Sequence, residues 1–321
     1  MLDVRRLTLL CDLDRLGTIA AVAQARSYTP SAVSQQLSAL EREAGTELLE
    51  RSGRRVTLTA AGHTLVAHAE AVLAALERAT AALAQLSAGL TGPLSIGAFP
   101  TAARTLLPAA LIRLGRDHPG LDLRVTELDP VAVPRALRER RLDVGLVQDY
   151  DLAPAAPEPG LDSTALLDET VHLATPATSP RTTVEQCHDA AWILPSPGTL
   201  CHTVTVQVCR AAGFVPRARH YADDFATVLA LVAADQGVSL VPQLAAGPVA
   251  AGASPVVVDR TSPRGASPAG GVRLSTLPAR RRTRIAYRRG AGAHPAIAAF
   301  VAALRDSAAD HLPAATGTVD R

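Results

Sequence analysis

The chain has 321 residues, a length that suits two or three domains and excludes a single small module. Aromatic residues make up only 3% of the sequence and hydrophobic residues 48%, so the cores must be built from Ala, Val and Leu in helices and parallel strands, which argues against an all-β protein. The net charge is +2 and the sequence contains no lysine, so every fixed positive side chain is an arginine, but this near-neutral balance does not by itself indicate a nucleic-acid partner.

The sequence gives no signal for export or for membrane insertion. No charged segment followed by an apolar run opens the chain, and the longest apolar stretch, near residues 225–234, stops at Asp235. We therefore expect a cytoplasmic protein without a membrane span. The cysteines show no CxxC spacing, so we expect them to be reduced thiols: Cys11, Cys187, Cys201 and Cys209.

The first sixty residues contain short periodic segments that are broken by glycine or proline, at Gly17, Pro30, Gly45 and Gly53. This pattern predicts three short helices followed by a turn between two strands. The third helix begins at Pro30, because Thr29 offers a side-chain acceptor at the N-cap and proline at the first helical position loses no hydrogen bond. Segment 18–26 forms the preceding helix, and the tight connection at 27–29 makes the pair a helix-turn-helix.

The third helix is amphipathic when its residues are projected at about 100° per residue. Its apolar face holds Val33, Leu37, Leu40 and Ala44. The opposite face holds Ser31, Gln35, Ser38 and Arg42, with Ser34 and Gln36 on the flanks. Small hydroxyls and glutamine on an outward face suit the major groove of DNA, where glutamine can bind N6 and N7 of adenine. The alternative interpretation is an ordinary solvated face, and this helix alone does not decide between them.

Two short segments, 48–51 and 55–59, flank a turn that carries arginines. The tip of this hairpin is formed by Arg51, Arg54 and Arg55 around Gly53. Such a tip suits the minor groove or the backbone phosphates of DNA. The alternative is a solvated turn.

Residues 64–90 predict one long helix, because no proline and no glycine interrupt them before Gly89. Apolar residues recur in alternating steps of four and three, at Leu65, Ala69, Val72, Leu76, Ala79, Leu83, Leu86 and Leu90. This heptad seam favours pairing with the same helix of a second subunit. The contact residues would be Leu65, Val72, Leu76, Leu83 and Leu86. The alternative is an amphipathic helix that lies on its own domain.

Beyond Thr91-Gly92-Pro93 strands alternate with helices, which predicts parallel sheets in two α/β lobes. In the first lobe we expect strands at 94–98, 121–128 and 142–147, helices at 106–116 and 133–141, and a turn at 100–104. After the proline-rich stretch 153–160 we expect strands at 170–175, 191–194 and 238–241 and helices at 200–212 and 224–234. A flexible loop at 247–271 with a short strand at 256–258, a strand at 284–288 and a helix at 295–305 complete the chain.

Several motifs in the first sixty residues keep one register. They are Thr18-Ile19-Ala20-Ala21-Val22-Ala23, Pro30-Ser31-Ala32-Val33-Ser34-Gln35-Gln36-Leu37, Leu40-Glu41, Gly45, Leu48-Leu49-Glu50-Arg51 and Val56-Thr57-Leu58-Thr59-Ala60-Ala61-Gly62. Together they resemble the signature of LysR-type transcriptional regulators. Three later segments resemble landmarks of the effector domain of that family, at 92–97, 142–146 and 237–242.

This resemblance implies a winged helix-turn-helix, a long linker helix and a two-lobed α/β effector domain shaped like a periplasmic binding protein. It also implies homodimers or dimers of dimers on double-stranded promoter DNA, a small-molecule effector in the cleft between the lobes, and RNA polymerase as a further candidate partner. The corresponding division of the chain is 1–60 for DNA binding, 61–90 for dimerisation, 91–309 for effector binding and 310–321 as a disordered tail.

The resemblance also assigns site residues. DNA recognition falls on Thr29, Pro30, Ser31, Ser34, Gln35 and Gln36, and on Arg51, Arg54 and Arg55 in the wing. Effector contacts fall on Pro100, Thr101, Ala102, Gln148, Asp149, Ser196, Gly198 and Thr199. For the effector set the alternative is that polar residues at strand ends merely cap loops.

Two positions depart from the family pattern. Leu49 stands where phenylalanine is usual, which is a mild change in the core. Arg26 stands where leucine is usual, on the apolar stripe of the second helix. Its guanidinium must find a buried carboxylate or extend past the helix end into water, and we expect the latter.

No pattern of catalytic residues is present. The histidines form neither HExxH nor a cluster, and no GxSxG, GxGxxG or P-loop occurs, so we expect no metal, no cofactor and no enzyme activity. Cys201 and Cys209 resemble in rough position the redox pair of peroxide-sensing LysR-type proteins, but their spacing differs and we expect a structural role. The rival function is a soluble binding protein or enzyme whose N-terminal unit serves only protein interaction, and a DNA-binding test separates the two.

Overall fold

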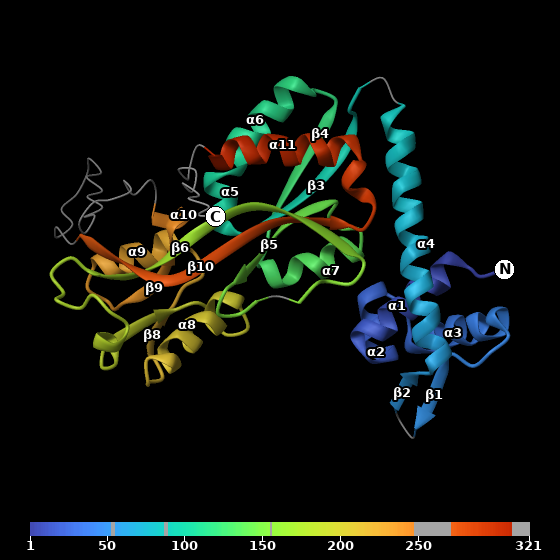
Figure 1. The fold of residues 1–321 in the computed structure, drawn as a ribbon, viewed down its shortest axis with the longest axis horizontal. Helices are drawn as coiled ribbons and strands as arrows, with labels where there is room; N and C mark the ends of the chain where they lie inside the picture. Colours follow the sequence, from blue (N-terminus) through green and yellow to red (C-terminus); the bar gives the residue numbers. More distant parts are fainter. Residues whose placement is uncertain (53–54, 87–88, 155, 247–270, 310–321) are drawn as a thin grey trace, which may run out of the picture.

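The computed structural model describes residues 1–52, 55–86, 89–154, 156–246 and 271–309. Figure 1 shows a small helical unit with a two-stranded hairpin, a long helix α4 that rises from it, and an elongated α/β domain beside that helix.

The N-terminal unit packs three helices over a hairpin. Its elements are α1 (Val4–Leu16), α2 (Ile19–Arg26), α3 (Pro30–Ala44), β1 (Leu49–Ser52) and β2 (Arg55–Leu58). Asp3, Thr18 and Thr29 cap the three helices by accepting hydrogen bonds from backbone N–H groups of the first turn. The core is aliphatic and includes Leu10, Val22, Val33, Leu37 and Leu40. The expected helix-turn-helix therefore has a complete core of its own.

Helix α4 (Ala60–Gln85) connects this unit to the α/β domain. It begins before the expected start at residue 64 and ends before the expected end at residue 90, and Gly89 and Gly92 both adopt positive φ where the chain turns into the first strand of the sheet. Leu86 is thus the C-cap of α4 and Leu90 lies beyond it.

The α/β domain is built on a sheet of order β4-β3-β5-β10-β6-β9 within the described residues. Its strands are β3 (Gly92–Ala98), β4 (Leu121–Glu127), β5 (Val144–Tyr150), β6 (Leu161–Pro176), β9 (Ser239–Pro242) and β10 (Val272–Arg288). Strand β3 runs parallel to β4 and β5, but β10 runs antiparallel to both β5 and β6. The expectation of a parallel sheet is therefore wrong for this part, because two long return strands join the lobes.

Helices cover the sheet and form two lobes. The first lobe holds α5 (Pro100–Thr105), α6 (Leu107–Asp117), the 3-10 turns Pro130–Ala132 and Ala291–Ala293, α7 (Val133–Arg138) and α11 (Pro295–Ala309). The second holds the 3-10 turn Glu185–Cys187, β7 (Ala191–Leu194), α8 (Leu200–Ala211), β8 (Arg217–Tyr221), α9 (Phe225–Ala233) and α10 (Gln243–Ala246). In Figure 1, α6 and α11 lie along one side of the sheet and α7 along the other, while β6 and β10 extend through both lobes.

Some elements differ from the expected ones, and others cannot be compared. The turn expected at 100–104 is helix α5, and β8 was missed because its residues are polar and mostly exposed. The strand expected at 256–258 and the tail at 310–321 lie outside the described residues.

Candidate DNA interface and effector site

The turn between α2 and α3 is fixed by local hydrogen bonds. Ser27 adopts the left-handed conformation at φ 55° and closes α2, and the N–H of Tyr28 donates to the carbonyl of Ala23 at 2.9 Å. The hydroxyl of Thr29 then accepts from the N–H of Ala32 at 3.2 Å, with Pro30 at the first position of α3. Thr29 and Pro30 therefore set the start of α3.

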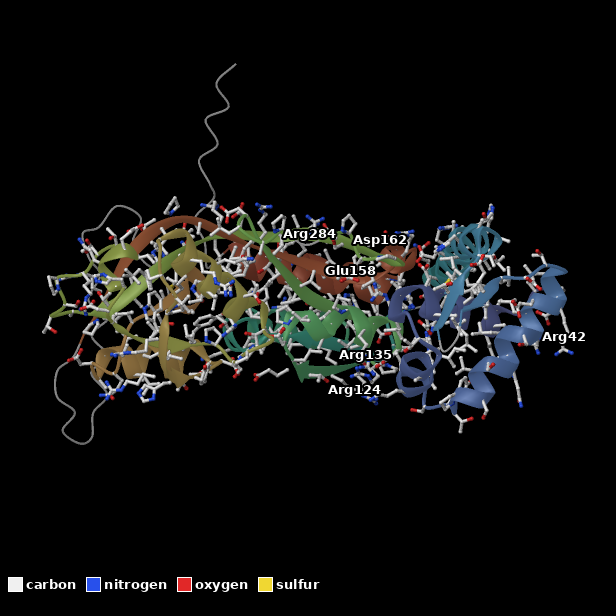
Figure 2. The ribbon with its side chains drawn as sticks, turned by 90° about the horizontal axis from the view of Figure 1, so that it is seen from below. Arg42, Arg124, Arg135, Glu158, Asp162 and Arg284 are labelled. Carbon is white, nitrogen blue, oxygen red and sulfur yellow. The ribbon has the colours of Figure 1, made fainter. Side chains whose placement is uncertain are left out.

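The outward face of α3 is polar and open. Ser31, Gln35 and Gln36 are exposed and Ser34 is half-buried. Gln36 accepts a hydrogen bond from Nε of Arg6 at 2.9 Å, whereas the side chain of Gln35 makes no hydrogen bond among the described residues. Figure 2 shows Arg42, on the same helix, pointing outward at the end of the molecule remote from the α/β domain. Gln35 is the member of this face whose amide is available to a partner.

The hairpin after α3 has the backbone of a wing. In its ladder Glu50 pairs with Thr57, Arg51 with Val56 and Ser52 with Arg55. Arg51 and Arg55 therefore flank the tip on opposite strands, while Arg54 lies outside the described residues.

The apolar seam of α4 divides into two parts. Leu65 and Ala69 pack into the core of the N-terminal unit, so the alternative of packing on its own domain holds for this first part. Farther along, the seam is exposed at Val72, Leu76, Leu83 and Leu86, with Leu83 69% and Leu86 84% exposed. An unpartnered apolar stripe of this kind is typical of a contact surface.

A different face of α4 contacts the α/β domain. Ala74, Glu77 and Ala81 are buried on that face, which helical periodicity places opposite the exposed stripe. A Cβ on Gly290 would come within 2.4 Å of the carbonyl oxygen of Ala74, and Nε2 of Gln85 donates to the carbonyl of Ala293 at 3.1 Å. The helix is thus held by its own subunit on one side and bare on the other.

Several of the predicted effector residues form hydrogen bonds within the chain or lie in the first turn of a helix. Ser196 bonds Asp223 twice at 2.7 Å, through its N–H and its hydroxyl, and Thr199 caps α8 by accepting from the N–H of His202. Gly198 is exposed beside them. In the first lobe, Pro100, Thr101 and Ala102 form the first turn of α5, with Thr101 and Ala102 buried.

The neighbours Gln148 and Asp149 point to opposite faces of β5, as strand geometry requires. Asp149 forms an ion pair with Arg282, its partner across the ladder, at 3.3 Å. Gln148 is buried, and its Nε2 has no hydrogen-bond partner among the described residues. Thr283 lies directly opposite Gln148, and its buried hydroxyl is unpartnered in the same part of the structure. Two neighbouring unsatisfied polar groups in the interior mark a place where a ligand or water can bind.

Beside this pair lies the most buried charge pair of the domain. Arg281 on β10 is 1% exposed and Glu169 on β6 is 0% exposed, and Nε of the arginine donates to Oε1 of the carboxylate at 2.8 Å. The other carboxylate oxygen accepts from the N–H of Leu244 at 2.6 Å, and the guanidinium stacks 5.3 Å from the ring centre of Phe99. Burial is the largest single influence on Arg281 and opposes its charged form, but the Glu169 carboxylate, together with smaller contributions from Tyr150 and Cys201, raises the pKa of Arg281 above its ordinary value.

We call Gln148, Tyr150, Glu169, Arg281 and Thr283 the buried polar cluster. Tyr150 connects the cluster to the second lobe, because its hydroxyl lies 3.4 Å from Sγ of Cys201 on α8. The cluster therefore sits where β5, β10 and α8 meet, between the lobes.

Sequence reasoning found Gln148 but missed the rest of this cluster. Arg281 and Glu169 are 112 residues apart, so their pairing leaves no local pattern. The run Arg280-Arg281-Arg282 suggests a solvated segment, and the alternation around it was the only available signal that its middle residue faces inward.

The structure also resolves the question of Arg26. Its Nε donates to Oδ2 of Asp12 at 2.6 Å, and the Asp12 side chain is only 6% exposed and also bonds Arg15. The expectation that Arg26 extends into water is wrong, because a buried carboxylate on α1 compensates for the departure from leucine.

Within the described residues no group of three or more His, Cys, Asp or Glu side chains could hold a metal ion. In the same part of the chain no helix is long and apolar enough to cross a membrane.

Comparison with protein families assigns both halves of the chain. Residues 4–63 match the bacterial regulatory helix-turn-helix protein, lysR family, and residues 87–309 match the LysR substrate binding domain. The chain is 35% identical over 232 residues to a probable hydrogen peroxide-inducible genes activator of Mycobacterium avium, covering 70% of this chain and 73% of the relative. It is 28% identical over 248 residues to the nitrogen assimilation regulatory protein nac of Escherichia coli, covering 76% and 80%.

Solved structures show the same architecture. A cysteine mutant of Corynebacterium glutamicum OxyR superposes with a TM-score of 0.53 at 26% identity, covering 96% of this chain and 92% of that one. A full-length cysteine mutant of Pseudomonas aeruginosa OxyR superposes with a TM-score of 0.57 over 98% of both chains at 23% identity, which bears on the fold alone.

Proposed function

The chain belongs to the LysR family of bacterial DNA-binding transcriptional regulators, and from that premise we propose that it binds promoter DNA as a homodimer and regulates transcription in response to a small molecule. We divide it as 1–60 for DNA binding, 61–90 for dimerisation and 91–309 for effector binding. A regulator of this type acts in the cytoplasm, where the chromosome and RNA polymerase are.

The observation that carries the DNA-binding proposal is the open polar face of α3. Ser31 and Gln35 are exposed on the first turns of α3, and Thr29 and Pro30 fix the start of that helix. Such a helix can enter the major groove with Gln35 on a base edge and Ser31, Ser34 and Gln36 on bases or phosphates. The wing arginines would contact phosphates or the minor groove, and these contacts make the binding salt-dependent.

The exposed stripe of α4 supports the dimer. Val72, Leu76, Leu83 and Leu86 are bare in the single chain, while the opposite face of the helix is occupied by the α/β domain. Pairing of two such stripes would bury them and set two recognition helices at a fixed spacing, as a two-fold operator requires. Dimers of dimers would need a second surface.

For the effector we propose the buried polar cluster together with Thr101. Gln148 and Thr283 offer unpaired hydrogen-bonding groups, and Glu169 already neutralises Arg281. A site with this composition favours a neutral, hydrogen-bonding molecule over an anion.

The peroxide-inducible relatives raise the question of thiol chemistry in this chain. Burial raises the pKa of Cys187 to about 11 and that of Cys209 to about 12, and it also raises the pKa of Cys201, so all three remain protonated at neutral pH. Cys201 and Cys209 lie eight positions apart on α8, which separates them by about 12 Å of helix and prevents a disulfide while α8 is intact. We therefore propose reversible ligand binding as the signal.

Hydrogen peroxide tests this point directly. Treatment of the purified protein with a modest excess of peroxide should leave its promoter affinity and its free-thiol count unchanged. A change in affinity that Cys201→Ser abolishes would replace ligand binding with thiol oxidation.

Gel retardation of the DNA upstream of its own gene tests the function as a whole. We expect a retarded complex that resists random competitor DNA and weakens steeply as salt rises. The rival function, a binding protein or enzyme with an N-terminal protein-interaction unit, predicts no salt-sensitive complex at all.

A further inference from the structure

A small pocket lies at the junction of the N-terminal unit, α4 and the effector domain. Its volume is about 100 Å³, which is room for a few water molecules or for one small oxyanion, given that a water molecule occupies about 30 Å³ of liquid. Two carboxylates, Glu70 and Glu77, line it. Six guanidinium groups also line it, those of Arg15, Arg26, Arg138, Arg140, Arg288 and Arg289.

Ion pairs hold the arginines of the effector-domain side of the pocket against α4. Arg140 and Arg288 both approach Oε1 of Glu77, at 2.5 and 3.2 Å, and Arg289 lies 3.4 Å from Oε2 of Glu70. The close packing of Gly290 on Ala74 leaves little freedom for this wall to shift.

The opposite wall comes from the N-terminal unit. Arg15 and Arg26 share the buried carboxylate of Asp12, which holds both guanidinium groups from behind. A Cβ built on Gly160 would lie 3.8 Å from Nη1 of Arg15, so this nitrogen points across the junction toward the effector domain. Arg26, which replaces the usual leucine of α2, thus lines the pocket.

The charges around the pocket are arranged asymmetrically. The other carboxylates that pair with its arginines, Asp12, Asp143, Glu158 and Asp162, are not part of its lining. They position the guanidinium groups from outside, and each guanidinium carries five N–H donors, more than these pairs consume. An adjoining groove of about 420 Å³ is different, because four arginines and four acidic residues line it in balance.

We propose that this pocket binds a small, multiply charged oxyanion such as inorganic phosphate, which bridges the DNA-binding unit to the effector domain of the same chain. Each of the six arginines pairs with a carboxylate, but four of these six carboxylates lie outside the lining, where arginines outnumber carboxylates six to two. The N–H groups that the carboxylates leave unused can donate charge-assisted hydrogen bonds to the oxygens of such a ligand. The occupant is a free anion rather than DNA, because the recognition face of α3 points away from this junction. Figure 2 shows Arg42 on that face and Arg135 and Glu158 on the junction side.

The bridge has a regulatory consequence that does not depend on the effector site. An anion held by Arg15 and Arg26 on one side and by Arg140 and Arg289 on the other fixes the orientation of the DNA-binding unit. Promoter affinity would then respond to the concentration of the anion as well as to the effector.

Calorimetry and thermal melting of the full-length protein with sodium phosphate test the proposal in the absence of DNA. Ionic strength is kept constant with sodium chloride. We expect saturable binding and a rise in melting temperature that chloride alone does not produce. Binding should weaken about tenfold or more in Arg140→Gln and in Arg289→Gln, each of which loses a charged donor at an exposed position where the substitution leaves the fold intact.

Arg124→Gln is the matched control, because Arg124 is an exposed arginine on β4 outside the pocket lining (Figure 2). It should bind phosphate as the wild type does. Equal loss in the control, or a melting shift that chloride reproduces, would reduce the effect to general ionic screening and overturn the site. Wild-type affinity in Arg15→Gln would overturn the bridge. Failure of promoter binding, measured separately, bears only on the proposed function.

Discussion

The outward face of α3 and the buried polar cluster contain similar side chains in opposite environments. Gln35 on α3 is exposed and its amide is bonded to nothing in the described chain, whereas Gln148 on β5 is buried beside the Arg281–Glu169 pair. An exposed polar group keeps its water until a partner displaces it, so its replacement changes binding and leaves folding intact. A buried polar group has lost its water already, so its replacement changes folding first. The two regions should therefore separate recognition from stability.

The largest effect should come from breaking the buried pair. Arg281→Leu leaves the carboxylate of Glu169 buried without its cation, and we expect a loss of about 3 to 5 kcal/mol in the free energy of unfolding. Denaturant titration measures it. The double variant Arg281→Leu with Glu169→Leu should recover most of the loss, because no unpaired charge remains. Equal destabilisation of the single and double variants would mean that packing, not charge, is what the pair supplies.

Substitutions in the exposed apolar stripe of α4 should change binding, here of a second subunit, and leave the fold of the single chain intact. Leu83 and Leu86 touch little in the single chain, so Leu83→Glu with Leu86→Glu should leave the subunit folded and make it monomeric by light scattering. Promoter binding should weaken by at least about tenfold, or about 1.4 kcal/mol, since one half-site remains per protein.

A matched control lies on the flank of the same helix. Ala67 and Ala71 are exposed away from the stripe, and glutamate at both should leave the dimer intact. A wild-type mass for the Leu83→Glu, Leu86→Glu variant would show that the stripe is not the subunit contact.

A smaller effect should come from Arg26, whose half-buried side chain is neither fully exposed like Gln35 nor fully buried like Arg281. Arg26→Leu removes one of two arginines from Asp12, and Arg15 still pairs with that carboxylate. We expect a loss of about 1 kcal/mol in the free energy of unfolding, because the apolar burial of leucine offsets part of the roughly 1.5 to 3 kcal/mol that is typical of a hydrogen bond to a charged group. Thermal melting checks it, and a gain in stability would show that the burial of leucine outweighs the ion pair.

The two regions also differ in how much of them the sequence could predict, and the α3 face is the more predictable one. The start of α3 follows from Thr29 and Pro30, neighbours whose capping geometry needs no tertiary context. The exposure of Gln35 follows from helical periodicity alone. The wing strands and the heptad seam are local patterns of the same kind.

The proposed effector site depends on contacts that no local pattern encodes. Strands β6 and β10 pair along most of their length, with the register interrupted between Thr276 and Arg280, yet only short stretches of each, 170–175 and 284–288, were expected from the sequence. Their arginines and acidic residues weaken the apolar signal, and their antiparallel return through both lobes is set by tertiary pairing. Ser196 and Thr199 were chosen as ligand contacts from their position, but their hydroxyls serve the chain itself.

The central claim, that the exposed face of α3 recognises the DNA sequence, is tested most directly by fluorescence anisotropy with Gln35→Ala on promoter and random duplexes. Gln207→Ala, an exposed glutamine on α8, is the control. We predict that Gln35→Ala loses about 1 to 3 kcal/mol on the promoter, with unchanged binding to random DNA and an unchanged melting temperature. Equal losses on both duplexes, or a loss matched by Gln207→Ala, would contradict the assignment of α3 as the recognition helix.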